Sequence, residues 1–241
     1  MFYTDPSVSL ATQLASIRDR LSIAARRANR DPDSIQLMAV CKTFPAQAIL
    51  EAYDAGQRLF GENRVQEFAD KYPKLAHLGD AQFHMIGHLQ SNKAARAAEI
   101  FHAVDSLDSA KLAQRLNDAA QKLNKMLDVL IEINVGAEDA KSGLAPDSPE
   151  IDTILSQATN WPNLRIRGLM TVPPYTDDPE GAHPYFRQLR ELRDRLAARN
   201  YAAVALDILS MGMSHDFEVA IEEGSTCVRI GTAIFGERDY H

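Results

Sequence analysis

Short apolar runs and helix-like stretches alternate along the chain from residue 35 onward. Eight runs are rich in β-branched or aromatic residues and predict strands, at residues 35–43, 58–61, 82–87, 100–106, 126–135, 165–172, 205–211 and 227–235. Between them, apolar residues recur at helical spacing, over residues 46–55, 63–71, 91–98, 108–123, 149–158, 182–199 and 214–223. Strict alternation of strand and helix predicts a parallel sheet.

Eight strand–helix units fit a single closed (β/α)8 barrel, the TIM barrel, whose usual length is about 250 residues. An open, doubly wound sheet is the alternative architecture. The first thirty residues predict an additional helix packed on the barrel, with Pro6 in its first turn. Its apolar face consists of Leu10, Leu14, Ile17, Leu21 and Ala24. We therefore predict one domain over residues 1–241, in which residues 1–30 form the N-terminal helix.

The composition is that of a globular chain, with 45% hydrophobic and 24% charged residues among 241. The net charge of −7 gives no overall attraction to nucleic acid or to an anionic membrane surface. No stretch reaches the ~18 uninterrupted apolar residues of a membrane span. The first ten residues lack the basic-then-apolar pattern of an export signal. We expect a cytoplasmic protein with no nucleic-acid or membrane partner.

Functional residues of such barrels lie where the strands end and in the loops that follow them. The two least regular, most polar stretches, residues 136–150 and 173–184, follow the fifth and sixth strands and are candidate lids. The chain has no dinucleotide-binding, P-loop, zinc-protease or serine-hydrolase motif. His84 and His88 are four residues apart, but Gly87 and the strand context disfavour joint metal binding, so we predict no metal site.

Lys42 ends the first predicted strand, which is otherwise nearly all apolar. The two-residue period of a strand places Met38, Val40 and Lys42 on one face and Cys41 on the other. If Lys42 faces the barrel interior, partial desolvation lowers the pKa of its amine and favours attack on an aldehyde. The alternative is an ordinary lysine whose ammonium reaches water at a strand end.

Two segments near the C-terminus suggest an anion site. Ser214 follows the seventh strand, where we expect it to cap a helix, and the exposed N–H groups at a helix start bind anions. Gly231 allows close backbone approach at the end of the eighth strand, and Thr232 adds a hydroxyl. Phosphate sites of these barrels commonly lie there. The alternatives are that Ser214 is only a cap and that Asp216, in the first turn, repels an anion.

Two further polar residues have positions of interest. Arg229 lies in the middle of the last strand, where its side chain points either into the barrel or outward. If it points inward, its guanidinium needs a hydrogen-bond acceptor, either a ligand or Glu132 on the facing strand. Asn63 follows the second strand and would either hydrogen-bond at the rim or cap the next helix. Cys41 and Cys227 lie on neighbouring strands but near opposite ends, beyond disulfide reach.

Taken together, several motifs resemble the YggS/PROSC family of pyridoxal phosphate homeostasis proteins over nearly the whole chain. They are AVCKTF, FGENRVQE, HMIGHLQSNK, AKSG, RGLMTVPP and LSMGMSHDFEVAIEEGSTCVRIGTAIFGER. The resemblance implies a barrel similar to the N-terminal domain of alanine racemase, the third fold type of pyridoxal 5′-phosphate (PLP) proteins. Many members have serine at the position of Cys41, and bacterial members often have proline at that of His88.

The resemblance also implies roles for particular residues. Lys42 matches the lysine that forms an aldimine with PLP. Ser214, Gly231 and Thr232 match the phosphate-binding residues, and Arg229 matches an arginine near the pyridine nitrogen. Asn63 matches a polar residue beside the cofactor.

A cation at the pyridine nitrogen opposes its protonation and makes the ring a poorer electron sink. We therefore expect a non-catalytic, monomeric PLP carrier or regulator that influences amino-acid and keto-acid balance, with PLP-dependent apoenzymes as recipients. Lys141 would be a secondary acceptor or an ordinary loop lysine. One alternative is a PLP-dependent racemase with His84 or Tyr175 as second base. Another is an aldolase that uses Lys42 without a cofactor.

Overall fold

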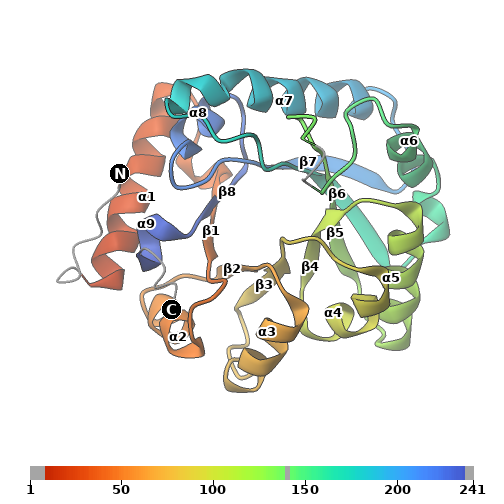
Figure 1. The fold of residues 1–241 in the computed structure, drawn as a ribbon, viewed down its shortest axis with the longest axis horizontal. Helices are drawn as coiled ribbons and strands as arrows, with labels where there is room; N and C mark the ends of the chain where they lie inside the picture. The colour runs from red at the N-terminus through yellow and green to blue at the C-terminus, as the bar shows by residue number, and fades with distance from the viewer. Residues whose placement is uncertain (1–8, 139–141, 237–241) are drawn as a thin grey trace.

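A computed structural model of the protein describes residues 9–138 and 142–236. In this part of the chain, eight parallel strands form a closed barrel in sequence order, and the last strand pairs with the first (Figure 1). The predicted (β/α)8 barrel is therefore confirmed, and the open sheet is excluded. The strands are β1 Gln36–Val40, β2 Leu59–Glu62, β3 Gln82–Met85, β4 Ala103–Leu107, β5 Leu127–Glu132, β6 Leu164–Met170, β7 Val204–Ser210 and β8 Cys227–Ile230.

Helices surround the ring of strands (Figure 1). They are α1 Leu10–Arg27, α2 Ala46–Asp54, α3 Val65–Lys71, α4 Ala94–Ile100, α5 Ala110–Lys122, α6 Pro149–Ser156, α7 His183–Ala197, α8 Phe217–Glu222 and α9 Thr232–Phe235. Short 3-10 turns are η1 Pro32–Ser34, η2 Tyr72–Lys74, η3 Ser91–Lys93, η4 Ala158–Asn160 and η5 Pro179–Ala182. No helix within the described residues is long and apolar enough to cross a membrane.

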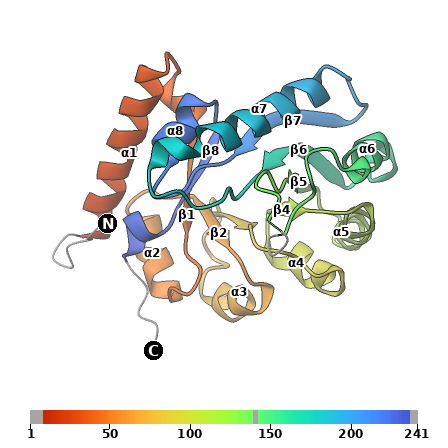
Figure 2. The ribbon, with the colours of Figure 1, turned by 45° about the horizontal axis from the view of Figure 1, so that its top comes forward.

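The additional helix α1 packs outside the barrel against α8, α9 and α2 (Figure 2). It begins at Leu10 because the Ser9 hydroxyl accepts a hydrogen bond from the Thr12 N–H and caps the first turn. The predicted start near Pro6 falls outside the described residues. Apart from Leu10, which is half-buried, the predicted apolar face is buried, as Leu14, Ile17, Leu21 and Ala24.

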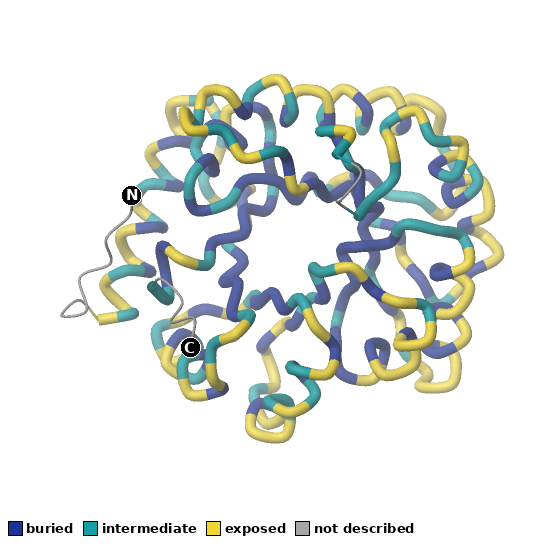
Figure 3. The backbone as a smooth tube through the Cα atoms, in the orientation of Figure 1, coloured by how far each residue is buried: buried dark blue, intermediate teal, exposed yellow. Residues whose placement is uncertain are grey.

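The hydrophobic core lies mainly between the barrel and its helices, and Figure 3 shows the strands as largely buried. Ala39 and Cys41 belong to this core, whereas Val40 and Lys42 line a cavity inside the barrel rim. The predicted alternation along the first strand is confirmed. Cys41 and Cys227 are both free and buried.

Several predicted strands extend too far at their C-terminal ends, and the first and the last show the cause. β1 ends at Val40, because the chain turns at Thr43, whose φ is +69°, and the Phe44 N–H bonds back to the Cys41 carbonyl. β8 ends at Ile230 because the Ile234 and Phe235 N–H groups both bond to the Gly231 carbonyl and start α9. The apolar residues that suggested strand at the end of the last run pack as one helical turn.

Candidate functional site

A cavity of about 540 Å³ opens where the strands end. The cavity is lined by residues that follow β1, β2, β3, β6 and β7, by residues of β5 and β8, and by the turn after β8. All six residues predicted to bind a cofactor line it, namely Lys42, Asn63, Ser214, Arg229, Gly231 and Thr232. The barrel thus brings residue 42 together with residues far along the chain.

Lys42 is half-buried and lies in the turn after β1 rather than in the strand itself. It lines the cavity beside Val40, so of the two alternatives left open by the sequence the structure supports a lysine on the interior face. Gly231 helps to bring β8 close to this point. A Cβ atom at Gly231 would lie 3.3 Å from the Val40 carbonyl oxygen, which is tight, so glycine lets the end of β8 pass next to Lys42.

Ser214 does not cap α8, contrary to our expectation. The helix begins at Phe217, with Asp216 at its N-cap position, and the Asp216 Oδ1 atom accepts a hydrogen bond from the Met213 N–H at 2.6 Å. The buried Ser214 hydroxyl instead accepts from the Ala233 N–H at 3.4 Å. This bond ties the turn after β7 to the first turn of α9. Ser214, Gly231 and Thr232 therefore form one side of the cavity.

Asp216 is buried near this group, and burial raises the pKa of its carboxyl group.

Arg229 is buried and turned toward the lumen. It donates hydrogen bonds to the Ser210 carbonyl at 2.6 Å, to the Ser210 hydroxyl at 2.8 Å and to the Thr171 carbonyl at 2.6 Å. Among the described residues it forms no ion pair with Glu132, so that alternative is wrong. Burial lowers the pKa of Arg229, yet a guanidinium stays protonated in proteins. The cavity therefore has a fixed cation in its wall.

Glu132 and Asn63 present buried acceptors at the cavity. The Glu132 Oε1 atom accepts from the Ser142 hydroxyl at 3.1 Å, and burial raises the pKa of this carboxyl group. Neither Glu132 Oε2 nor Asn63 Oδ1 has a hydrogen-bond partner in the described part of the chain. Asn63 is not a helix cap, because Arg64 occupies the N-cap position of α3. Unpaired buried acceptors are uncommon and are often completed by a ligand or water.

The two predicted second bases lie elsewhere. The His84 Nδ1 atom contacts Asp105 at 3.1 Å inside the barrel, and His84 lines a separate small cavity. Tyr175 is 76% exposed and stacks on His215 at a ring-centroid distance of 5.3 Å. Lys141 falls outside the described residues. No group of three or more His, Cys, Asp or Glu side chains among residues 9–138 and 142–236 is arranged to hold a metal ion.

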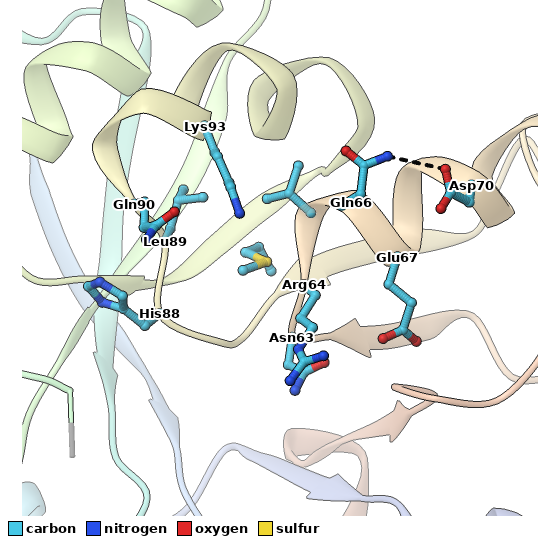
Figure 4. Close-up of a pocket in the computed structure, with 11 residues that line it drawn as sticks. Asn63, Arg64, Gln66, Glu67, Asp70, His88, Leu89, Gln90 and Lys93 are labelled. Atoms are coloured by element: carbon cyan, nitrogen blue, oxygen red, sulfur yellow. Dashed lines mark hydrogen bonds between the residues drawn. The ribbon is translucent and has the colours of Figure 1, made fainter. Parts of the chain in front are cut away.

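Several lining residues were not predicted from the sequence as cofactor-binding: Val172, Met213, His215 and Ser142. Ser142 and Val172 fall in or next to the two predicted lid loops, so the loops could be located although these side chains could not. Figure 4 shows a neighbouring cavity of about 550 Å³ between α3 and η3, which shares Asn63 and His88 with the first. Its lining carries both signs of charge, with Arg64 and Lys93 opposite in sign to Glu67 and Asp70.

The alanine racemase N-terminal domain model matches residues 12–239 of the chain. A pyridoxal phosphate homeostasis protein of Aquifex aeolicus is 47% identical over 228 residues, which cover 95% of this chain and 98% of the relative. The protein of the same name from Escherichia coli K12 is 45% identical, covering 96% of this chain and 97% of its own. The chain belongs to the pyridoxal phosphate homeostasis protein family. The resemblance noted in the sequence motifs is confirmed.

Solved structures agree with this membership. The structure of PipY from Synechococcus elongatus, solved with PLP bound, has a TM-score of 0.82 at 38% sequence identity to this chain. The match covers 95% of this chain and 100% of the PipY chain. Alanine racemase of Clostridium difficile has a TM-score of 0.70 at 15% identity, and the match covers 98% of this chain and 60% of the racemase. The second likeness concerns the fold alone, because the identity is only 15%.

Proposed function

We propose that the protein holds PLP through Lys42 and regulates the intracellular level of this cofactor, and with it amino-acid and keto-acid balance, without catalytic turnover. The observation that carries the proposal is the shared cavity, which is lined by Lys42 together with Ser214, Gly231 and Thr232. Membership of the homeostasis protein family and the PLP-bound structure of PipY support it.

The residues present fit the cofactor. PLP supplies an aldehyde that condenses with an amine, and it also carries a pyridine ring and a phosphate group. The cavity of about 540 Å³ is within the usual range of about 300–1,000 Å³ for small-molecule sites. It offers one primary amine from Lys42, hydroxyl groups from Ser214 and Thr232, and the fixed cation of Arg229. An amine, anion-binding hydroxyls and a cation are the donor set that an anionic aldehyde requires.

Each residue then has a distinct role in holding the group. Lys42 provides the covalent attachment. The hydroxyl groups of Ser214 and Thr232 donate to phosphate oxygens, and the absence of a side chain at Gly231 lets the phosphate approach the backbone. Asn63 hydrogen-bonds beside the ring, which would satisfy its unpartnered Oδ1 atom.

Arg229 supports a binding role rather than a catalytic one. Its three bonds to Ser210 and Thr171 hold the guanidinium in place, and a cation beside the pyridine nitrogen disfavours protonation of the ring. A racemase also needs a second acid–base group on the opposite face of the substrate. Neither His84 nor Tyr175 lines the cavity, so the present geometry favours the carrier over the racemase.

The same role defines the partners. A carrier that releases its cofactor would supply PLP-dependent apoenzymes in the cytoplasm, and we include these recipients in the proposal. Residues from β1 to the turn after β8 line the same cavity, which supports one cofactor-binding domain, and we include a monomeric state in the proposal.

The absorbance spectrum tests the proposal. Purified wild-type protein incubated with PLP and then freed of excess cofactor should show a visible band, and Lys42→Ala should show none. Lys93→Ala, which removes an exposed lysine of the neighbouring cavity, is the matched control and should retain the band. A wild-type protein that stays colourless after incubation would refute the proposal, as would a band in Lys42→Ala equal to that of the wild type.

A further inference from the structure

An ionic network with a buried pair at its centre connects α3 to the end of β1. The Lys71 ammonium donates to Glu62 Oε1 at 2.9 Å and to Glu67 Oε1 at 2.8 Å. The Glu62 side chain is fully buried, and that of Lys71 is only 11% exposed. Glu62 lies at the end of β2, whereas the other two residues lie on α3. We name Glu62, Glu67 and Lys71 the α3 clamp.

The clamp bonds to both peptide groups that flank Lys42. The third bond of the Lys71 ammonium goes to the Cys41 carbonyl at 3.2 Å, in the peptide group that precedes Lys42. Glu67 Oε1 accepts the Thr43 N–H at 2.6 Å, in the peptide group that follows it. Because these two peptide planes determine the direction of the Cα–Cβ bond between them, the clamp sets where the Lys42 side chain points.

Stability alone does not account for this arrangement. Taking charges out of water offsets most of the attraction within a buried ion pair, and apolar residues of similar volume often stabilise a protein as well. The Glu62 Oε2 atom moreover has no hydrogen-bond partner among the residues described. Thr43 has a φ of +69°, a strained conformation for a β-branched residue that surrounding contacts must maintain. Strained backbone of this kind is concentrated at functional sites.

The network also distinguishes two neighbouring lysines. Burial acts to lower the pKa of Lys71, but the charge of Glu62 and the hydrogen bonds to Glu62 and Glu67 outweigh it, so the pKa lies above its ordinary value. All three ammonium protons already have acceptors. Lys71 therefore remains a charged donor within the clamp, and the reactive amine at this edge of the barrel is that of Lys42.

We propose that Glu67 and Lys71 are positioning residues, which orient Lys42 toward the cavity for its reaction with the aldehyde. The inference rests on the proposed function, because it takes Lys42 as the attachment point. It adds that α3, which supplies no predicted cofactor-binding residue, controls the rate at which the cofactor attaches.

Two conservative variants of Glu67 distinguish the effect of side-chain length from the effect of side-chain charge. Glu67→Gln keeps an oxygen at the distance that Thr43 and Lys71 require but removes the charge. Glu67→Asp keeps the charge but withdraws it by one methylene group from the Thr43 N–H. Because small displacements of reacting groups slow reactions strongly, Glu67→Asp should form the visible band about tenfold more slowly, whereas Glu67→Gln should remain within about threefold of wild type.

The rates are measured with PLP and with unphosphorylated pyridoxal, and induced circular dichroism of the band reports the orientation of the attached group. Glu67→Asp should be slowed with both aldehydes and should show altered dichroism, because the defect lies at Lys42 and not at the phosphate. Asp70→Asn is the control on the same helix, since the Asp70 carboxylate accepts a hydrogen bond from Gln66 and none from Lys71 or Thr43 within the described residues (Figure 4). It should match the wild type.

The outcomes separate the two proposals. Urea unfolding of each variant establishes that it is folded. If folded Glu67→Asp reacts as fast as the wild type, or if Gln and Asp at residue 67 slow the reaction equally, the clamp does not position Lys42. If the wild type itself develops no band, the proposed function fails, and the positioning role fails with it.

Discussion

Removing the Ser214 hydroxyl is expected to weaken the binding of PLP through its phosphate. The hydroxyl oxygen accepts the Ala233 N–H at 3.4 Å, and within the described structure its own proton has no acceptor, so it is available to an anion. Ser214 is only 9% exposed, so water would not replace it effectively. The bond to Ala233 is lost in free and bound protein alike and does not contribute to the difference in affinity.

The magnitude follows from one charge-assisted hydrogen bond. Such a bond contributes about 1.5–3 kcal/mol. Since about 1.4 kcal/mol corresponds to a factor of ten, Ser214→Ala should raise the dissociation constant for PLP about 10- to 100-fold. Pyridoxal has no phosphate, so its affinity should change by less than about twofold on the same reasoning.

Titration of the visible band with each aldehyde measures both affinities. Ser109→Ala is a matched control, because the Ser109 hydroxyl accepts the Leu112 N–H at 3.3 Å as the cap of α5, outside the cavity. It should cost about 1 kcal/mol of stability without changing either affinity. Equal weakening of PLP and pyridoxal by Ser214→Ala would refute the assignment of Ser214 to the phosphate.

Two further predictions concern stability. A Cβ atom at Gly168 would lie 1.9 Å from the Ile208 carbonyl oxygen, so Gly168→Ala should lower the free energy of unfolding by at least about 1–3 kcal/mol. A Cβ atom at Gly79 would have no neighbour within 4 Å, so Gly79→Ala should change this free energy by less than about 0.5 kcal/mol. Urea unfolding measures both. Burial lowers the pKa of His102 from 6.5 to about 4. At acid pH the unfolded state then binds more protons than the folded state, so the free energy of unfolding should fall by up to about 3 kcal/mol as the pH is lowered from 6.5 toward 4. His102→Gln should lack this pH-dependent loss. An identical pH profile of stability in the variant would contradict the assignment.

Patterns within single elements were sufficient for much of the fold. Strand and helix alternation predicted the barrel, and the two-residue period of β1 placed Lys42 on the same face as Val40, which the structure shows to be the interior face. These predictions succeed because side-chain direction in a strand is a local property of the backbone. The positions of the six predicted cofactor residues followed partly from this alternation and partly from motifs that resemble a known family.

Other features depended on contacts between distant segments. α9 has only four residues, too few for a helical period to be recognised, and it forms where the Gly231 carbonyl accepts two N–H groups. The true partner of Ser214 is the N–H of Ala233, which no local cap rule indicates.

The α3 clamp shows most clearly the difference between what local sequence patterns determine and what contacts between distant segments determine. The residue types and their order along the chain were enough to place a lysine at the end of the first strand, on the same face as Val40. Its orientation required Glu67 and Lys71 to come within hydrogen-bond distance of the peptide groups of Thr43 and Cys41. Side-chain alternation is encoded residue by residue, whereas such bonds exist only once barrel closure and helix packing have brought separate segments together.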